Sequence, residues 1–163
     1  DHLTLLRSIK YLIKQKLKIK LLLIGYGPNK NKILNYIKKN KLSKFIKIIK
    51  FQNNPYKYIQ KSNLFILSSL YEGLPNVLLE AMSLKKFVIS SNCPTGPKEI
   101  LKNGKYGILF NPGDKKDLSK KIINYYNHKK KYDKIIFKAY NSLDRFDFKN
   151  NCEKYLSVIK EFI

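Results

Sequence analysis

The sequence is poor in cysteine and in long apolar runs. Its 163 residues include 2 cysteines, Cys93 and Cys152, which is too few for a disulfide-held scaffold and is typical of a reducing compartment. No apolar run approaches the roughly 18 residues that a membrane-spanning helix needs. The two histidines, His2 and His128, show no metal-ligand spacing with each other or with the cysteines. These scarcities exclude a disulfide-rich module and a membrane span.

Negative charge is scarce as well. The chain has 34 Lys+Arg against 11 Asp+Glu, a net charge of +23, and after Asp1 no acidic residue occurs until Glu72. Only Arg7 and Arg145 are arginines, so the excess is lysine, which lacks the forked donors suited to phosphates and bases. The lysines are spread among Ile and Asn, which favours a solvated surface over specific nucleic-acid binding. Attraction to an anionic membrane is a second interpretation.

Apolar residues are plentiful. They make up 44% of the chain, with 12 Tyr and 9 Phe, which is enough for a core and excludes wholesale disorder. The length fits one domain or one lobe of a larger protein. Because residue 1 is Asp1 and the only methionine is Met82, we expect a piece of a longer chain. Helical apolar spacing from Leu5 to Ile13 predicts that the piece opens close to a helix start.

Apolar segments alternate between two lengths along the chain. Short runs that predict buried strands lie at residues 20–25, 45–51, 63–68, 87–90 and 106–110. Helices are predicted near residues 33–37, 56–61, 75–84 and 95–101, after an N-cap at Asp114, and through the tail. This alternation predicts an α/β fold, a Rossmann-like three-layer domain with a mostly parallel sheet of about five or six strands.

Parallel sheets place ligands at the carboxyl ends of their strands. The loops at these ends are residues 25–28, 51–54, 68–76, 91–96 and 111–113. The first contains Gly25 and Gly27, but a dinucleotide-binding fingerprint would need glycine where Lys30 stands. The turn is therefore either a tight strand-to-helix connection or a backbone cradle near a phosphate or sugar.

The segment richest in chemistry is residues 71–82 (YEGLPNVLLEAM). Glu72 follows a predicted strand, and a helix is predicted to start at Pro75 with free amides around Leu74–Val77 that form an anion site. Glu80 lies about 6–9 Å further along that helix axis. Two carboxylates around an anion site suit a nucleotide-activated sugar. The structural alternative is that Glu72 is a helix N-terminal charge and Glu80 a solvated side chain.

The setting E-G-L-P-N-V-L-L-E-A-M, with Glu72 and Glu80 separated by seven residues, resembles the E-x7-E motif of the family 4 (group 1) retaining glycosyltransferases. Further resemblances follow in the family's order. They lie at residues 22–28 (LLIGYGP), 54–59 (NPYKYI), 90–100 (SSNCPTGPKEI) and 104–114 (GKYGILFNPGD). Together they cover about residues 1–125.

This resemblance implies the C-terminal, donor-binding lobe of a GT-B fold, with no cofactor and no metal; the sequence has no D-x-D. It implies a catalytic role for Glu72 beside the donor sugar and hydroxyl binding by Glu80 to the ribose. The residues that it implies for the sugar, the diphosphate and the base are Gly73, Leu74, Pro75, Asn76, Phe51, Gln52, Gly25 and Gly27. The family usually has glycine where this chain has Lys50.

The resemblance also implies missing parts. The family's diphosphate-binding Arg and Lys, its first strand and its acceptor-binding N-terminal lobe would precede Asp1. We therefore expect a nucleotide-sugar-binding domain at residues 1–130 and a helical extension at 131–163 that packs back on the domain or on the N-terminal lobe. The piece alone is expected to bind donor weakly and to transfer nothing.

The predicted function is transfer of a sugar, from a UDP-linked or other nucleotide donor, to a glycan or polyprenyl-linked acceptor with retention of configuration. The donor sugar expected is a hexose or N-acetylhexosamine. The predicted location is cytoplasmic, with peripheral contact at an anionic membrane. Two alternatives are a nucleotide-sugar epimerase of the same architecture and a non-catalytic, lysine-rich nucleic-acid-binding domain.

Overall fold

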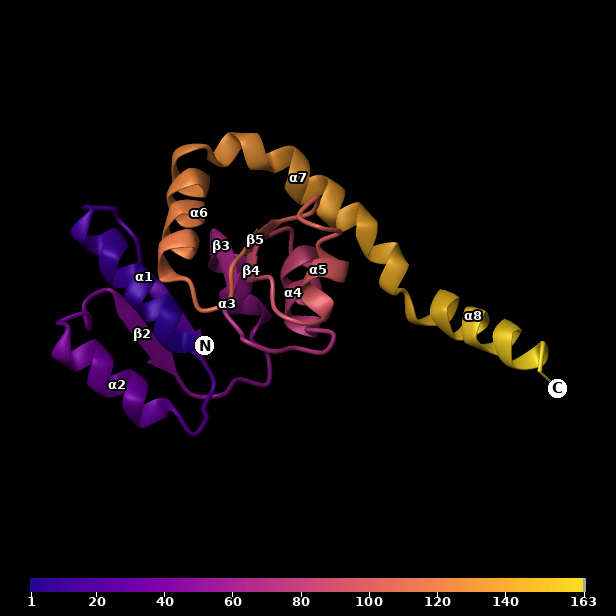
Figure 1. Cartoon of the computed structure of the whole chain (residues 1–163), viewed down its shortest axis with the longest axis horizontal. Helices are drawn as coiled ribbons and strands as arrows, with labels where there is room; N and C mark the ends of the chain where they lie inside the picture. Colours follow the sequence, from indigo (N-terminus) through magenta and orange to yellow (C-terminus); the bar gives the residue numbers. More distant parts are fainter. Residues whose placement is uncertain (163) are drawn as a thin grey trace.

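Short strands alternate with helices through most of the chain, as the apolar pattern predicts. The structure is a computed structural model that describes residues 1–162, and Figure 1 shows its arrangement. The strands are β1 (Leu21–Ile24), β2 (Ile46–Ile49), β3 (Leu64–Leu67), β4 (Phe87–Ser91) and β5 (Ile108–Phe110). The helices are α1 (His2–Lys14), α2 (Lys30–Lys39), α3 (Tyr56–Lys61), α4 (Asn76–Ser83), α5 (Gly96–Ile100), α6 (Lys115–Asn127), α7 (Lys129–Asn141), the 3-10 helix η1 (Ser142–Phe146) and α8 (Phe148–Lys160). All five predicted strands form.

All the strand pairs are parallel, which confirms the predicted α/β class. β1 pairs with β2, with Leu21 opposite Ile46. β4 lies between β3 and β5. The strands thus form a two-stranded and a three-stranded sheet, because within residues 1–162 no strand pairs with the free edge of β1 or of β3. The predicted sheet is divided at that point.

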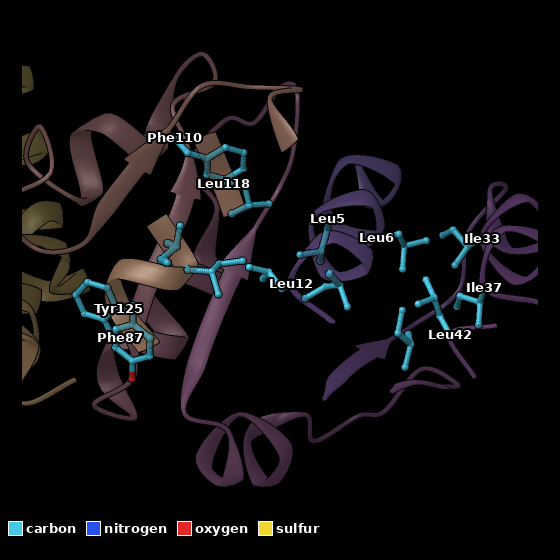
Figure 2. Close-up of a cluster of buried hydrophobic side chains, with 14 of the residues drawn as sticks. Leu5, Leu6, Leu12, Ile33, Ile37, Leu42, Phe87, Phe110, Leu118 and Tyr125 are labelled. Atoms are coloured by element: carbon cyan, nitrogen blue, oxygen red, sulfur yellow. The ribbon is translucent and has the colours of Figure 1, made fainter. Parts of the chain in front are cut away.

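β4 lies at the centre of the packing. All five of its residues are buried, and its three apolar residues alternate between two apolar clusters. Phe87 and Ile89 belong to the cluster formed with α1, α2 and α6, part of which is drawn in Figure 2. Val88 belongs to the cluster formed with α3, α4, α5 and α7. Because alternate residues of a strand point to opposite faces, helices cover both faces of the sheet and give the predicted three layers.

Aromatic side chains close one end of this core. The ring of Phe87 stacks on Tyr125 at a centroid distance of 4.9 Å and contacts Tyr132 at 4.5 Å. The Tyr125 hydroxyl donates a hydrogen bond to the Asn63 carbonyl at 2.7 Å. Burial, followed by the charge of Asp133, raises the pKa of Tyr125, so the phenol keeps the proton that this bond requires. The bond ties α6 to the start of β3.

The predicted N-cap at Asp114 is confirmed. Its carboxylate accepts hydrogen bonds from the backbone amides of Lys116 and Asp117, at 2.7 and 3.0 Å. The bond from Asp117, followed by that from Lys116, lowers the pKa of the Asp114 carboxyl. The cap fixes where α6 starts, and α6 then packs along α1.

The chain after residue 130 has two unlike parts. α7 packs on α4 and β4 and buries Tyr132 and Ala139, whereas α8 has no buried residue and projects from the domain in Figure 1. Large apolar side chains of α8 are exposed, among them Phe148, Tyr155 and Leu156. The division into residues 1–130 and 131–163 stays a prediction, and Ile163 lies outside the described residues.

Within residues 1–162, no helix is both long enough and apolar enough to cross a bilayer.

Candidate functional site

The predicted site residues lie at or just beyond the carboxyl ends of the strands, where the parallel topology places loops, except for Glu80, which lies within α4. They form two groups. One group follows β3 and runs into α4, and it contains Glu72, Gly73, Leu74, Pro75, Asn76 and Glu80. The other group follows β1 and β2, and it contains Gly25, Gly27, Phe51 and Gln52.

The Glu72 loop is fastened along its backbone to the loop between β4 and α5. The Glu72 amide donates to the carbonyl of Pro94, and the Thr95 amide donates back to the Glu72 carbonyl, both at 2.8 Å. One residue further on, the Gly96 amide donates to the Gly73 carbonyl, also at 2.8 Å. Three main-chain bonds of this kind hold the backbone of Glu72 on both sides.

Gly96 lets these two loops approach closely. A Cβ atom at this position would clash with the Gly73 carbonyl oxygen and would lie 2.7 Å from the Pro75 ring and 2.9 Å from the Leu74 Cα. Two of these neighbours are backbone atoms, which cannot swing away as a flexible side chain does. Glycine is therefore required at position 96 for the loops to interlock.

The Glu72 side chain is held by a serine from the same loop. The Ser69 hydroxyl donates to Glu72 Oε1 at 2.5 Å, and the Ser69 carbonyl accepts a bond from the hydroxyl of Ser91 at 2.6 Å. Ser91 is the last residue of β4 and is fully buried. The half-buried Glu72 is thereby linked to the central strand of its sheet.

α4 begins beside this carboxylate. Pro75 is its N-cap and no side chain caps the helix. Within residues 1–162, the backbone amides of Asn76 and Val77 have no protein hydrogen-bond partner. Such free amides favour an anion. Glu80 lies one turn into the same helix and is half-buried, so the β3–α4 unit carries both carboxylates of the sequence motif.

Part of the second group lines a hollow of about 170 Å³. Gly25 and Gly27 line it together with Tyr26, Ile48 and the end of β1. Gly25 has φ of +123°, which is a left-handed conformation that favours glycine and lets the chain turn directly after the strand.

Two exposed aromatic rings meet at the rim of this group. Tyr26 and Phe51 are 83% and 60% exposed, and their rings pack edge to face at 6.2 Å. The neighbouring Gln52 is held by hydrogen bonds: its amide nitrogen donates to the Phe51 carbonyl at 3.1 Å and its Oε1 accepts from the Tyr58 hydroxyl at 3.3 Å. Flat faces left open to solvent can stack on a planar ring.

The start of α1 lies beside the second group. His2 lines the hollow beside Gly25.

The sequence prediction did not include Ser69, Ser91, Gly96 or Tyr26 among the site residues. Ser69 could have been identified from the sequence, because it is a polar residue that follows a predicted strand and precedes a carboxylate by three positions. Gly96 had a weaker signal in the Pro-Thr-Gly-Pro turn. Ser91 had none, because a serine inside an apolar strand does not disclose which backbone atom it reaches.

Metal-binding side chains are not gathered here. Within residues 1–162, no three His, Cys, Asp or Glu residues lie close enough together to hold a metal ion.

Comparisons with known proteins identify relatives of the chain. The sequence model of the family described as "Glycosyl transferases group 1" matches residues 1–142. An uncharacterized glycosyltransferase of Methanocaldococcus jannaschii is 41% identical over 66% of this chain and 30% of its own length. The N-acetylgalactosamine-N,N'-diacetylbacillosaminyl-diphospho-undecaprenol 4-alpha-N-acetylgalactosaminyltransferase of Campylobacter jejuni is 32% identical over 67% of this chain and 29% of its own. The chain therefore spans about 30% of these relatives' length.

Solved structures support the fold. A crystal structure of a Staphylococcus aureus TarM mutant in complex with fondaparinux, alpha-GlcNAc-glycerol and UDP superimposes with a TM-score of 0.87. The match covers 94% of this chain and 31% of that one at 24% identity. The predicted architecture, one lobe of a GT-B fold, is thereby confirmed.

The close approach at Gly96 makes a prediction about stability. Gly96→Ala is expected to destabilise the chain by about 1–3 kcal/mol, the usual cost of overpacking, because the new methyl group must push the Gly73 carbonyl away. Thermal unfolding followed by circular dichroism measures the change. Gly27→Ala is the control, since a Cβ there meets nothing within 4 Å. Equal melting temperatures for the two variants would contradict the interlocked geometry.

Proposed function

The chain belongs to the group 1 glycosyltransferases, and we propose that it is the donor-binding part of an enzyme that transfers a sugar from a nucleoside diphosphate sugar. The observation that carries this proposal is the join between the Glu72 loop and α4. Glu72, whose carboxylate is held by the Ser69 hydroxyl and whose backbone is held by three main-chain bonds around it, precedes a helix start with free amides by only a few residues. The carboxylate suits sugar hydroxyls and the amides suit a diphosphate.

We assign the donor's parts to the two groups of residues. The sugar and diphosphate lie against Glu72, Gly73, Leu74, Pro75 and Asn76, and Glu80 accepts the ribose hydroxyls. The base lies by Phe51 and Gln52, with Tyr26 added from its ring contact, and Gly25 and Gly27 border the diphosphate. UDP is the proposed nucleotide; support comes from the TarM complex, which contains UDP on a similar fold.

In the proposed reaction the diphosphate leaves with the electrons of its bond to the anomeric carbon. The free amides at the start of α4 stabilise its charge, as preorganised donors do elsewhere. Glu72 positions the sugar. The acceptor hydroxyl bonds to the anomeric carbon from the face that the diphosphate leaves and passes its proton to the departing diphosphate oxygen, so configuration is retained. No metal takes part in this proposal. The acceptor site lies in a part of the protein outside this chain, so this chain alone binds donor and transfers nothing.

The proposed acceptor is a glycan or a polyprenyl-linked oligosaccharide, and the proposed donor sugar is an N-acetylhexosamine. The Campylobacter relative supports both, because its name describes transfer of N-acetylgalactosamine to a diphospho-undecaprenol-linked sugar. The epimerase and nucleic-acid alternatives find no support among these relatives, which are glycosyltransferases.

Contact with an anionic membrane is proposed through a lysine-rich edge of the fold. The segments that lead into β1 and β2 end side by side, because these strands pair in parallel. Exposed lysines fill both segments: Lys14, Lys16, Lys18, Lys20, Lys38, Lys39, Lys41 and Lys44. Within residues 1–162 the only ion pair joins Lys121 and Asp117, at 3.8 Å, so the positive charge of this edge is not neutralised by the protein.

The first prediction concerns donor binding to the chain itself. Titration with UDP is expected to shift the NMR signals of the Asn76 and Val77 amides, because these free donors meet the diphosphate. Uridine, which has no phosphate, is the control and is expected to leave them in place. If UDP shifts other resonances while these two amides stay fixed, the diphosphate is not bound at α4.

The second prediction concerns Glu72 in the whole enzyme. Glu72→Gln is expected to lower kcat at least ~100-fold, the scale for losing one transition-state contact. Glu99→Gln, which removes the same charge from an exposed site on α5, is expected to keep normal turnover. Turnover of a nucleotide sugar by both variants at the normal rate would remove Glu72 from catalysis.

The third prediction concerns membrane binding. Changing four edge lysines to glutamine is expected to weaken binding to anionic vesicles on the order of 10-fold or more, since each contributes up to ~1 kcal/mol near such a surface. The edge variant replaces Lys14, Lys16, Lys18 and Lys20. The control replaces Lys115, Lys116, Lys120 and Lys129. Vesicle co-sedimentation that is equal for neutral and anionic lipid, or equal for the two variants, would reject the proposal.

A further inference from the structure

We propose that Ser69 is a positioning residue for Glu72: its hydroxyl fixes one carboxylate oxygen and so aims the other at the donor sugar. This inference rests on the proposed function of Glu72 and extends it to a residue outside the E-x7-E motif.

The contact between the two side chains is short. Ser69 Oγ lies 2.5 Å from Glu72 Oε1, within the range of about 2.5–2.7 Å for a hydroxyl that donates to a charged carboxylate. A serine hydroxyl has one proton to donate. Ser69 therefore commits its only donor to Glu72, and Oε1 already accepts a hydrogen bond before any substrate arrives.

The second carboxylate oxygen remains accessible. Within residues 1–162, Glu72 Oε2 makes no protein hydrogen bond, yet no buried side-chain oxygen of this part of the chain lacks a partner. Oε2 must therefore reach the surface of the protein. One oxygen is anchored and the other is presented, which is the arrangement needed to accept a sugar hydroxyl in a defined direction.

Ser69 is itself held in place from outside its own loop. Its carbonyl oxygen accepts a hydrogen bond from Ser91 at 2.6 Å, and Ser91 is fully buried at the end of β4. The Glu72 backbone is fixed separately, by bonds with Pro94 and Thr95. The Glu72 side chain is therefore held at both ends, by its backbone and by the hydrogen bond at Oε1. Without the Ser69 hydroxyl only the backbone end is held.

Three substitutions in the intact enzyme separate positioning from general structural damage. Ser69→Ala removes the donor and is expected to lower kcat roughly 10- to 100-fold, the scale for a misplaced reacting group, with little change in donor KM. Ser69→Thr keeps the hydroxyl and is expected to restore most of the rate. Ser62→Ala removes a hydroxyl that bonds only to the Ile59 carbonyl in its own helix turn and is expected to change neither constant.

A measurement on the chain itself gives a readout that does not depend on activity. The ¹³C chemical shift of the Glu72 carboxyl, measured at pH 7, is expected to move in Ser69→Ala and to return in Ser69→Thr, while Ser62→Ala leaves it unchanged. A Glu72 signal that ignores Ser69→Ala would overturn the positioning contact.

The kinetic outcomes distinguish this proposal from the proposed function. If Glu72→Gln slows transfer but Ser69→Ala does not, Glu72 keeps its role and the positioning role of Ser69 is wrong. If Ser69→Ala raises KM as much as it lowers kcat/KM and Ser69→Thr fails to rescue, Ser69 serves binding or folding and the proposal is also wrong. If neither Glu72→Gln nor Ser69→Ala affects transfer, the proposed function of Glu72 fails together with it.

Discussion

The site depends on the interlocking of two loops that follow neighbouring parallel strands. β3 and β4 lie side by side in the same direction, so the loops that leave them emerge at one edge. Hydrogen bonds between Glu72, Gly73 and residues 94–96 then join these loops along their backbones. The joint requires the absence of a side chain at Gly96, and it decides where the Glu72 carboxylate and the start of α4 lie relative to each other.

The apolar core fixes the position of β4, the strand that leads into one of these two loops. Residues of β4 alternate between the two apolar clusters that cover the faces of the sheet, and its last residue, Ser91, reaches the carbonyl of Ser69. A strand buried on both faces has little freedom to move. The loops at its end therefore inherit fixed positions, which suits a site that must hold a charged group in one orientation.

The lysine-rich edge and the carboxylates of the candidate site lie at opposite ends of their strands. Lysines surround the entries to β1 and β2, whereas the carboxylates of the site follow the opposite, carboxyl end of β3. Between Asp1 and Glu72 no carboxylate occurs at all, so Glu72 lies at the boundary of a strongly positive half of the chain. Such a field attracts anionic ligands over the whole fold, and the local amides at α4 give one of them a defined place.

Much of this architecture could be predicted from the sequence alone. Short apolar runs and helical periods fix the order of strands and helices, because burial on a sheet face or a helix stripe repeats along the chain itself. The cap at Asp114 and the Glu72–Glu80 motif could also be predicted, because each depends on neighbours within one loop or one helix. The partnership of Ser69 with Glu72, the hydrogen bond from Ser91 to the Ser69 carbonyl and the ring contact between Tyr26 and Phe51 were decided only by the tertiary structure. These features join atoms whose separation depends on the packing of whole elements, or on side-chain rotamers set by that packing, and no local pattern encodes either.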